Sequence, residues 1–127
     1  MHNVQADILK NRLYLTLGNI ASKEEMQAIE VQVLQQVKCL KQGFTCVSDL
    51  RNFCMEKSLS DNFMQEIQEI LWDSGVRAVA RISPIRECKG HFRFEKGSAL
   101  WPGYTIIPVI SLAEAEEKLN NLDTHSA

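Results

Sequence analysis

The stretch Phe44–Asn62, FTCVSDLRNFCMEKSLSDN, decides the fold of this chain. Its first residues are apolar and favour a β-strand. The apolar pattern stops at Asp49, and a helical pattern follows. In α/β proteins, binding sites tend to lie where a central strand ends and the chain turns into a helix. We therefore expect a buried strand over 44–50 and a functional turn directly after it.

The densest cluster of polar side chains beside any predicted core strand lies at the end of this strand and in the segment after it. They are Asp49, Arg51, Asn52, Ser58, Ser60 and Asp61. Asp49 and Arg51 either pair with each other and close the turn, or form the polar rim of a site for a partner or an anionic ligand. Ser58 and Ser60 are suited to cap the next helix, because a serine hydroxyl accepts a hydrogen bond from a free backbone N–H. They are also the candidate phosphorylation sites, because a helix N-terminus favours negative charge.

Strands and helices alternate before this stretch. Arg12–Leu17 has leucine at every second residue, which is typical of a strand. We expect it to form a hairpin with residues 4–9. Ser22 followed by Glu25 is a capping box, which predicts a helix that begins there and that Gly43 ends.

The alternation continues after this stretch, and it predicts the fold class. We expect a helix from Ser58 or Ser60 to Gly75, a strand over 76–82, a short helix between Arg86 and Leu100, a strand over 104–110 and a final helix capped by Ser111 and Glu114. Residues 123–127 are expected to form a frayed tail. This order predicts a single α/β domain over residues 1–127, with a mixed sheet of about five strands centred on 44–50 and flanked by about four helices.

The composition is that of an ordinary globular protein. The 127 residues are 45% hydrophobic and 24% charged, with a net charge of -2. A general nucleic-acid binder usually shows a basic face, so we expect no nucleic-acid partner. No apolar run approaches the roughly 20 residues that span a bilayer, so we expect no transmembrane segment. The N-terminus lacks the pattern of a signal peptide, which predicts a cytoplasmic location.

The cysteines and aromatic residues suggest further functions. In the cytoplasm Cys39, Cys46, Cys54 and Cys88 are expected to be reduced. Phe92, Phe94 and Trp101 either cover the sheet as core or line a ligand pocket. Cys88 and His91 have the spacing of two metal ligands, but zinc usually takes three or four ligands from a protein, so we predict no metal site. A nucleophile built on this pair has no identifiable residue to orient it, so we predict no catalytic site and no cofactor.

The order of elements, together with the segments RLYLTLGNIASKEE, GFTCVSDLRNF and SLAEAEEKL, resembles the STAS domain, the superfamily of sulfate transporters and anti-sigma-factor antagonists. The resemblance covers nearly the whole chain and is closest to the free-standing bacterial members. In that family the central strand ends in an Asp-Leu pair, which corresponds to Asp49 and Leu50. The next helix begins with a serine that a partner kinase phosphorylates, and the corresponding region holds Ser58 and Ser60. This chain has KSLSDN there in place of the family's Asp-Ser-Gly motif.

These features lead to three hypotheses from different classes. The first is a non-catalytic regulatory or protein-interaction domain of the STAS-like type, which presents the turn from Asp49 to Asp61 to another protein. A homodimer is a further alternative that the sequence leaves open. The second is a small-molecule or lipid carrier with a pocket near residues 92–104. The third, an enzyme built on Cys88 and His91, is the least favoured. An exposed polar turn over a closed core would favour the first, and a deep aromatic pocket would favour the second.

Overall fold

The computed structural model describes residues 2–55, 63–83 and 105–125 of the chain. Within these ranges a five-stranded sheet has the order β1-β2-β4-β6-β7. Its strands are β1 (Asn3–Asp7), β2 (Arg12–Thr16), β4 (Thr45–Asp49), β6 (Ala78–Ile82) and β7 (Thr105–Val109). β1 and β2 form the predicted antiparallel hairpin, and the other neighbouring strands pair in parallel. The predicted mixed sheet is confirmed, and β4 is its middle strand.

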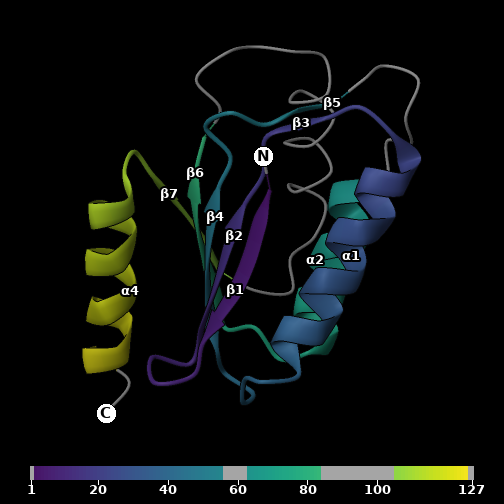
Figure 1. The fold of residues 1–127 in the computed structure, drawn as a ribbon. Coiled ribbons are helices and arrows are strands. Elements are labelled where there is room, and N and C mark those ends of the chain that lie inside the picture. The colour runs from purple at the N-terminus through teal and green to yellow at the C-terminus, as the bar shows by residue number, and fades with distance from the viewer. Residues whose placement is uncertain (1, 56–62, 84–104, 126–127) are drawn as a thin grey trace.

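Helices lie on both faces of the sheet (Figure 1). The structure has α1 (Lys23–Val37) and α2 (Phe63–Asp73) on one face and α4 (Leu112–His125) on the other. The described ranges contain three helices, fewer than predicted. The helix expected between Arg86 and Leu100 lies outside them. None of the described helices is long and apolar enough to cross a membrane.

A second, two-stranded sheet joins the segments that follow β2 and β4. It consists of β3 (Asn19–Ile20) and β5 (Cys54–Met55), which pair in parallel. Because β5 follows the turn after β4, this small sheet anchors the far side of that turn.

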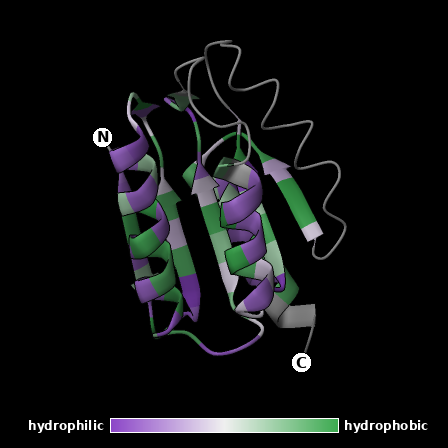
Figure 2. Ribbon diagram, turned by 90° about the vertical axis from the view of Figure 1, so that its right-hand side faces the viewer, coloured by the Kyte–Doolittle hydropathy of each residue, from purple (hydrophilic) through white to green (hydrophobic). Residues whose placement is uncertain are grey.

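Two apolar cores enclose the sheet. The larger core lies under α1 and α2, and Figure 2, which looks onto this side, shows that both helices carry hydrophobic and hydrophilic residues along their length. Val33 of α1, Phe63 of α2 and Cys46 of β4 are buried in it. The smaller core lies under α4, where Ala115 and Leu119 contact the other face of the sheet. The two cores follow from strand geometry, in which successive side chains point to opposite faces.

The two predicted serine caps are present and share one geometry. Ser22 Oγ accepts a hydrogen bond from the Glu25 backbone N–H at 3.2 Å, and Ser111 Oγ accepts one from Glu114 N–H at 3.1 Å. Each glutamate reaches back, but to the residue before the serine: Ala21 N–H donates to Glu25 at 3.0 Å, and Ile110 N–H donates to Glu114 at 2.7 Å. Local sequence therefore specifies both helix starts.

The predicted ends of two helices are wrong. α1 ends at Val37 and not at Gly43. The reason is a tertiary contact, because the Asn11 side chain accepts from Lys41 N–H at 2.8 Å and donates to Lys41 O at 3.2 Å. These bonds occupy the backbone groups that a longer helix would use. The tail predicted over 123–127 is wrong for residues 123–125, which belong to α4, and residues 126–127 lie outside the described residues.

Gly75 follows α2 as predicted. It has φ +95, and an added Cβ there would lie 2.9 Å from Gln42 Cγ. Glycine at this position therefore allows both the left-handed backbone and the close approach of the loop that leads into β4.

Glu30 of α1 interacts with Glu66 of α2, and this contact predicts a pH dependence of stability. Burial, the hydrogen bond with Glu66 and the charge of Glu66 together raise the pKa of Glu30 from 4.5 to about 7, and burial contributes most. The folded state therefore binds this proton more tightly than the unfolded state. The favourable contribution of protonated Glu30 is complete below pH 4.5 and is lost as the pH rises through about 7.

We expect Glu30→Gln to raise the free energy of unfolding at pH 8 by about 1 kcal/mol, a value reduced to allow for solvent screening of a partly exposed group. The gain should nearly vanish at pH 4.5, where the native carboxyl is already neutral. Urea unfolding at the two pH values measures it. Glu117→Gln, on exposed α4 surface, makes the same change in charge and is the control. A gain of equal size at both pH values, or in both variants, would contradict the prediction.

Candidate functional site

Asp49 and Arg51 form an ion pair in the turn after β4. The Arg51 guanidinium donates from Nε to Asp49 Oδ1 at 2.9 Å and from Nη2 to Oδ2 at 2.7 Å. The Arg51 backbone N–H also donates to Oδ1, at 3.2 Å. The carboxylate thus closes the turn, as the first of the two interpretations predicts. Its two-point contact also holds the guanidinium in one orientation.

The charges of this pair are unequally exposed. The Arg51 side chain is 40% exposed and that of Asp49 10%. Hydrogen bonding from the Arg51 side chain lowers the pKa of Asp49, although burial opposes the shift. The same hydrogen bond raises the pKa of Arg51. The pair is therefore fully ionised at neutral pH, and its cation is the member that faces solvent.

Backbone hydrogen bonds attach this turn to three neighbouring segments. Leu17 N–H donates to Asp49 O at 3.1 Å, and Leu50 N–H donates to Ile82 O at 3.0 Å. Cys54 N–H donates to Gly18 O at 3.4 Å. These bonds connect the turn to the ends of β2 and β6 and to the small sheet. Arg51 therefore projects from a backbone that is held on several sides.

The structure places only part of the predicted site. Asn52 is exposed and lies next to Arg51 in the turn. Ser58, Ser60 and Asp61 lie outside the described residues, and so do Cys88, His91, Phe92, Phe94 and Trp101. Among the residues that are described, no group of three His, Cys, Asp or Glu side chains could hold a metal ion.

The prediction of four reduced thiols is wrong for Cys54, which is disulfide-bonded. Cys39 and Cys46 are free. Burial raises the pKa of the Cys46 thiol to about 12, which makes it a poor nucleophile. The prediction failed because it used sequence spacing and the expected compartment, whereas a disulfide depends on which thiols the fold brings together.

A second polar cluster, which the sequence reasoning missed, lies between the sheet and α4. Its centre is Arg12, whose side chain is 0% exposed. Its guanidinium donates to Thr45 Oγ1 at 2.9 Å, to Glu116 Oε2 at 2.9 Å and to Asn120 Oδ1 at 3.3 Å. One side chain therefore links β2, β4 and α4.

Glu116 receives further hydrogen bonds in the same cluster. Lys10 Nζ donates to Glu116 Oε2 at 2.9 Å, and the Tyr14 hydroxyl donates to Oε1. Burial acts to raise the pKa of Glu116, but the hydrogen bonds from Tyr14 and Lys10 and the charge of Arg12 outweigh it, and the net shift is downward. Burial and Glu116 together raise the pKa of Tyr14. The cluster is thus an ionised carboxylate held by two cations and a neutral phenol.

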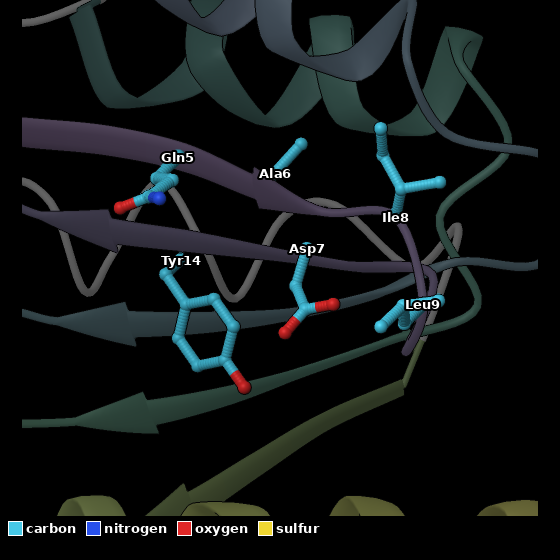
Figure 3. Close-up of a pocket in the computed structure, with 6 residues that line it drawn as sticks. All are labelled: Gln5, Ala6, Asp7, Ile8, Leu9 and Tyr14. Carbon is cyan, nitrogen blue, oxygen red and sulfur yellow. The ribbon is translucent and has the colours of Figure 1, made fainter.

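A hollow of about 400 Å³ lies beside this cluster (Figure 3). Its lining residues are Gln5, Ala6, Asp7, Ile8, Leu9 and Tyr14. Figure 3 shows Tyr14 and Asp7 extending from the sheet toward the α4 side and Ala6 extending toward the other helices. Ile8 and Leu9 are 69% and 99% exposed, so the apolar part of the lining is open to solvent. The hollow therefore lacks the enclosed apolar walls of a typical small-molecule site.

One part of the missed cluster was detectable in the sequence. The period of two that buries Leu13 and Leu15 on one face places Arg12 and Tyr14 on the other. An arginine inside a predicted strand calls for an acidic partner. Its partner Glu116 lies 104 residues away along the chain, and no local pattern identifies it.

No protein-family model matches the chain, and no curated protein matches it. The class that the fold defines is an α/β protein with a five-stranded mixed sheet.

Proposed function

We propose that this chain is a non-catalytic regulatory or protein-interaction domain of the STAS-like type, and that its contact surface is the turn from Asp49 to Asp61. The observation that carries the proposal is the Arg51 guanidinium, which Asp49 holds at two points while it stays 40% exposed. A cation fixed in this way is prepared to bind a carboxylate or phosphate of a partner at little entropic cost. Exposed Asn52 adds an amide beside it.

The position of this cation also supports the proposal. Arg51 lies just beyond the carboxyl end of β4, the middle strand, and this end is where open α/β sheets bind their ligands. The succession β2-α1-β4-α2-β6 is part of the order of elements on which, together with three sequence segments, the STAS-like resemblance rests. By that resemblance, Ser58 and Ser60 are the proposed phosphorylation sites, with a helix-capping role as the alternative.

The test compares partner capture by variants of this surface. Asn52→Glu places a carboxylate where it competes for Arg51 without removing the Asp49 pair, and Gln32→Glu makes the same change in charge on exposed α1 surface. Tagged wild type and both variants are incubated with extract from the source cells, and captured proteins are quantified by mass spectrometry. We expect a partner that Asn52→Glu captures at least about 10-fold less, a loss of the size that a disrupted charged contact produces.

Two outcomes of this experiment decide the proposal. Equal capture of every protein by wild type and Asn52→Glu, with unchanged melting temperatures, would remove the turn from the contact surface. If only Gln32→Glu lowers capture, the contact surface lies on α1 and not on the turn. Aspartate and alanine at Ser58 and Ser60, measured in the same assay, test the phosphorylation proposal separately.

The cytoplasmic location and the carrier alternative have less support. Disulfides are rare in the cytoplasm, so the bond at Cys54 weighs against that location. The carrier hypothesis depends on Phe92, Phe94 and Trp101, which lie outside the described residues, and the hollow beside Tyr14 is a different place.

A further inference from the structure

The two edges of the sheet present their backbones differently. The β7 edge contains Pro108, which has no N–H to donate. Proline and lysine are common devices that block pairing at an edge strand. The β1 segment, NVQAD, contains neither, and its only charged residue is Asp7. β1 is therefore the edge better suited to pair with another strand.

A side chain of α1 already occupies one backbone donor of β1. Ala6 N–H donates to Gln36 Oε1 at 2.9 Å. In an antiparallel pair, successive residues point their backbone groups alternately toward and away from the partner strand. Because Ala6 N–H points away from β2, the N–H and C=O of Val4 also point outward. Gln36 Oε1 thus occupies the position that a backbone carbonyl oxygen of a neighbouring strand would take.

The outward backbone groups of β1 are complementary to those of a second copy. If two β1 strands meet antiparallel with Gln5 opposite Gln5, Val4 of each copy lies opposite Ala6 of the other. Such a pair exchanges both N–H···O=C bonds. In this register Asp7 lies opposite the uncharged Asn3 of the second copy, so no like charges face each other. The two five-stranded sheets would then continue as one across a two-fold axis.

We propose that β1 is a self-association surface, where two copies of this chain pair antiparallel about Gln5, and that Gln36 weakens the pairing by competing for Ala6 N–H. A dimer can form only when the Gln36 side chain of each copy gives up its hydrogen bond from the Ala6 N–H. The wild type is therefore a weak dimer whose population rises with protein concentration. This interface is separate from the turn after β4, so the proposal is independent of the proposed function.

The experiment removes the competitor. In Gln36→Ala, two competing hydrogen bonds per dimer are lost, so we expect the dimer dissociation constant to fall about 30-fold. Gln32→Ala, one turn earlier on exposed α1 surface, is the matched control and should leave the constant unchanged. Sedimentation equilibrium over a range of concentrations measures all three proteins, and circular dichroism checks that each is folded.

Two further variants test the register in the Gln36→Ala background. Val4→Pro removes an outward N–H, and proline is tolerated at such edge positions, so dimerisation should be lost. Asn3→Asp places a carboxylate opposite Asp7, and we expect it to weaken the dimer about 5-fold. If Gln36→Ala dimerises no better than Gln32→Ala, or if its dimer survives both Val4→Pro and Asn3→Asp, the proposal is wrong. The protein could also be monomeric at all concentrations and yet gain hydrogen-exchange protection at β1 in cell extract. This result would show that a different protein pairs with this edge, and it would overturn self-pairing.

Discussion

Replacing Arg12 with alanine is expected to lower the free energy of unfolding by about 3–5 kcal/mol, as breaking a buried ionic network does. The guanidinium is fully buried and makes hydrogen bonds to Thr45, Glu116 and Asn120. The substitution removes these bonds and leaves a cavity where the arginine stem was packed. Denaturant unfolding at pH 7, followed by circular dichroism, measures the loss.

Two controls separate the causes of this loss. Arg12→Met keeps much of the buried stem, so it isolates the contribution of the guanidinium. Lys10→Ala removes the other cation on Glu116, but Lys10 is half-exposed and its ion pair is screened by solvent, so we expect a much smaller loss than for Arg12→Ala. If Arg12→Ala costs no more than Lys10→Ala, the buried network does not stabilise the fold as proposed.

The same cluster predicts that the free energy of unfolding decreases at acidic pH. The folded-state pKa of Glu116 is lowered, so its stabilising contribution is complete above its ordinary value of 4.5 and is lost as the pH falls through the folded-state value. The Arg12→Ala variant should therefore lose less stability than the wild type on acidification below pH 4.5.

Leu119→Ala is expected to lower the free energy of unfolding by about 3 kcal/mol, within the range for a buried leucine reduced to alanine. Leu119 is 0% exposed, and among the described residues it is the one leucine that is fully enclosed in the core under α4. Leu119 packs there with three buried alanines, Ala78, Ala80 and Ala115, and with the larger buried side chains of Val47, Ile82 and Val109. The loss should appear as a lower denaturant midpoint.

Leu112→Ala is the matched control for this prediction, because Leu112 lies on the same helix and is 45% exposed. We expect it to cost less than about 1 kcal/mol, since little apolar surface leaves water there. Equal costs for the two leucines would mean that α4 does not pack on the sheet through Leu119.

The fold was largely predictable because its signals are local. Alternation in β2, the apolar run of β4 and the serines that begin α1 and α4 each depend on residues within a few positions of one another. The candidate site was less predictable. Asp49 and Arg51 are two residues apart, so their pairing was one of the two interpretations considered. The exposure of Arg51 and the disulfide at Cys54 depend on what else the fold brings to that turn.

The sequence by itself determined the α/β class, the central place of β4 and the residues that begin α1 and α4, because backbone preferences and side-chain periodicity act over short distances. Only the tertiary structure decided which distant residues meet. It joins Arg12 to Glu116, ends α1 early through Asn11 and Lys41, and places Gln36 on the edge of β1. A sequence pattern specifies the face that a residue occupies, but the partner across that face depends on strand order and helix position. Those depend on the packing of the whole chain.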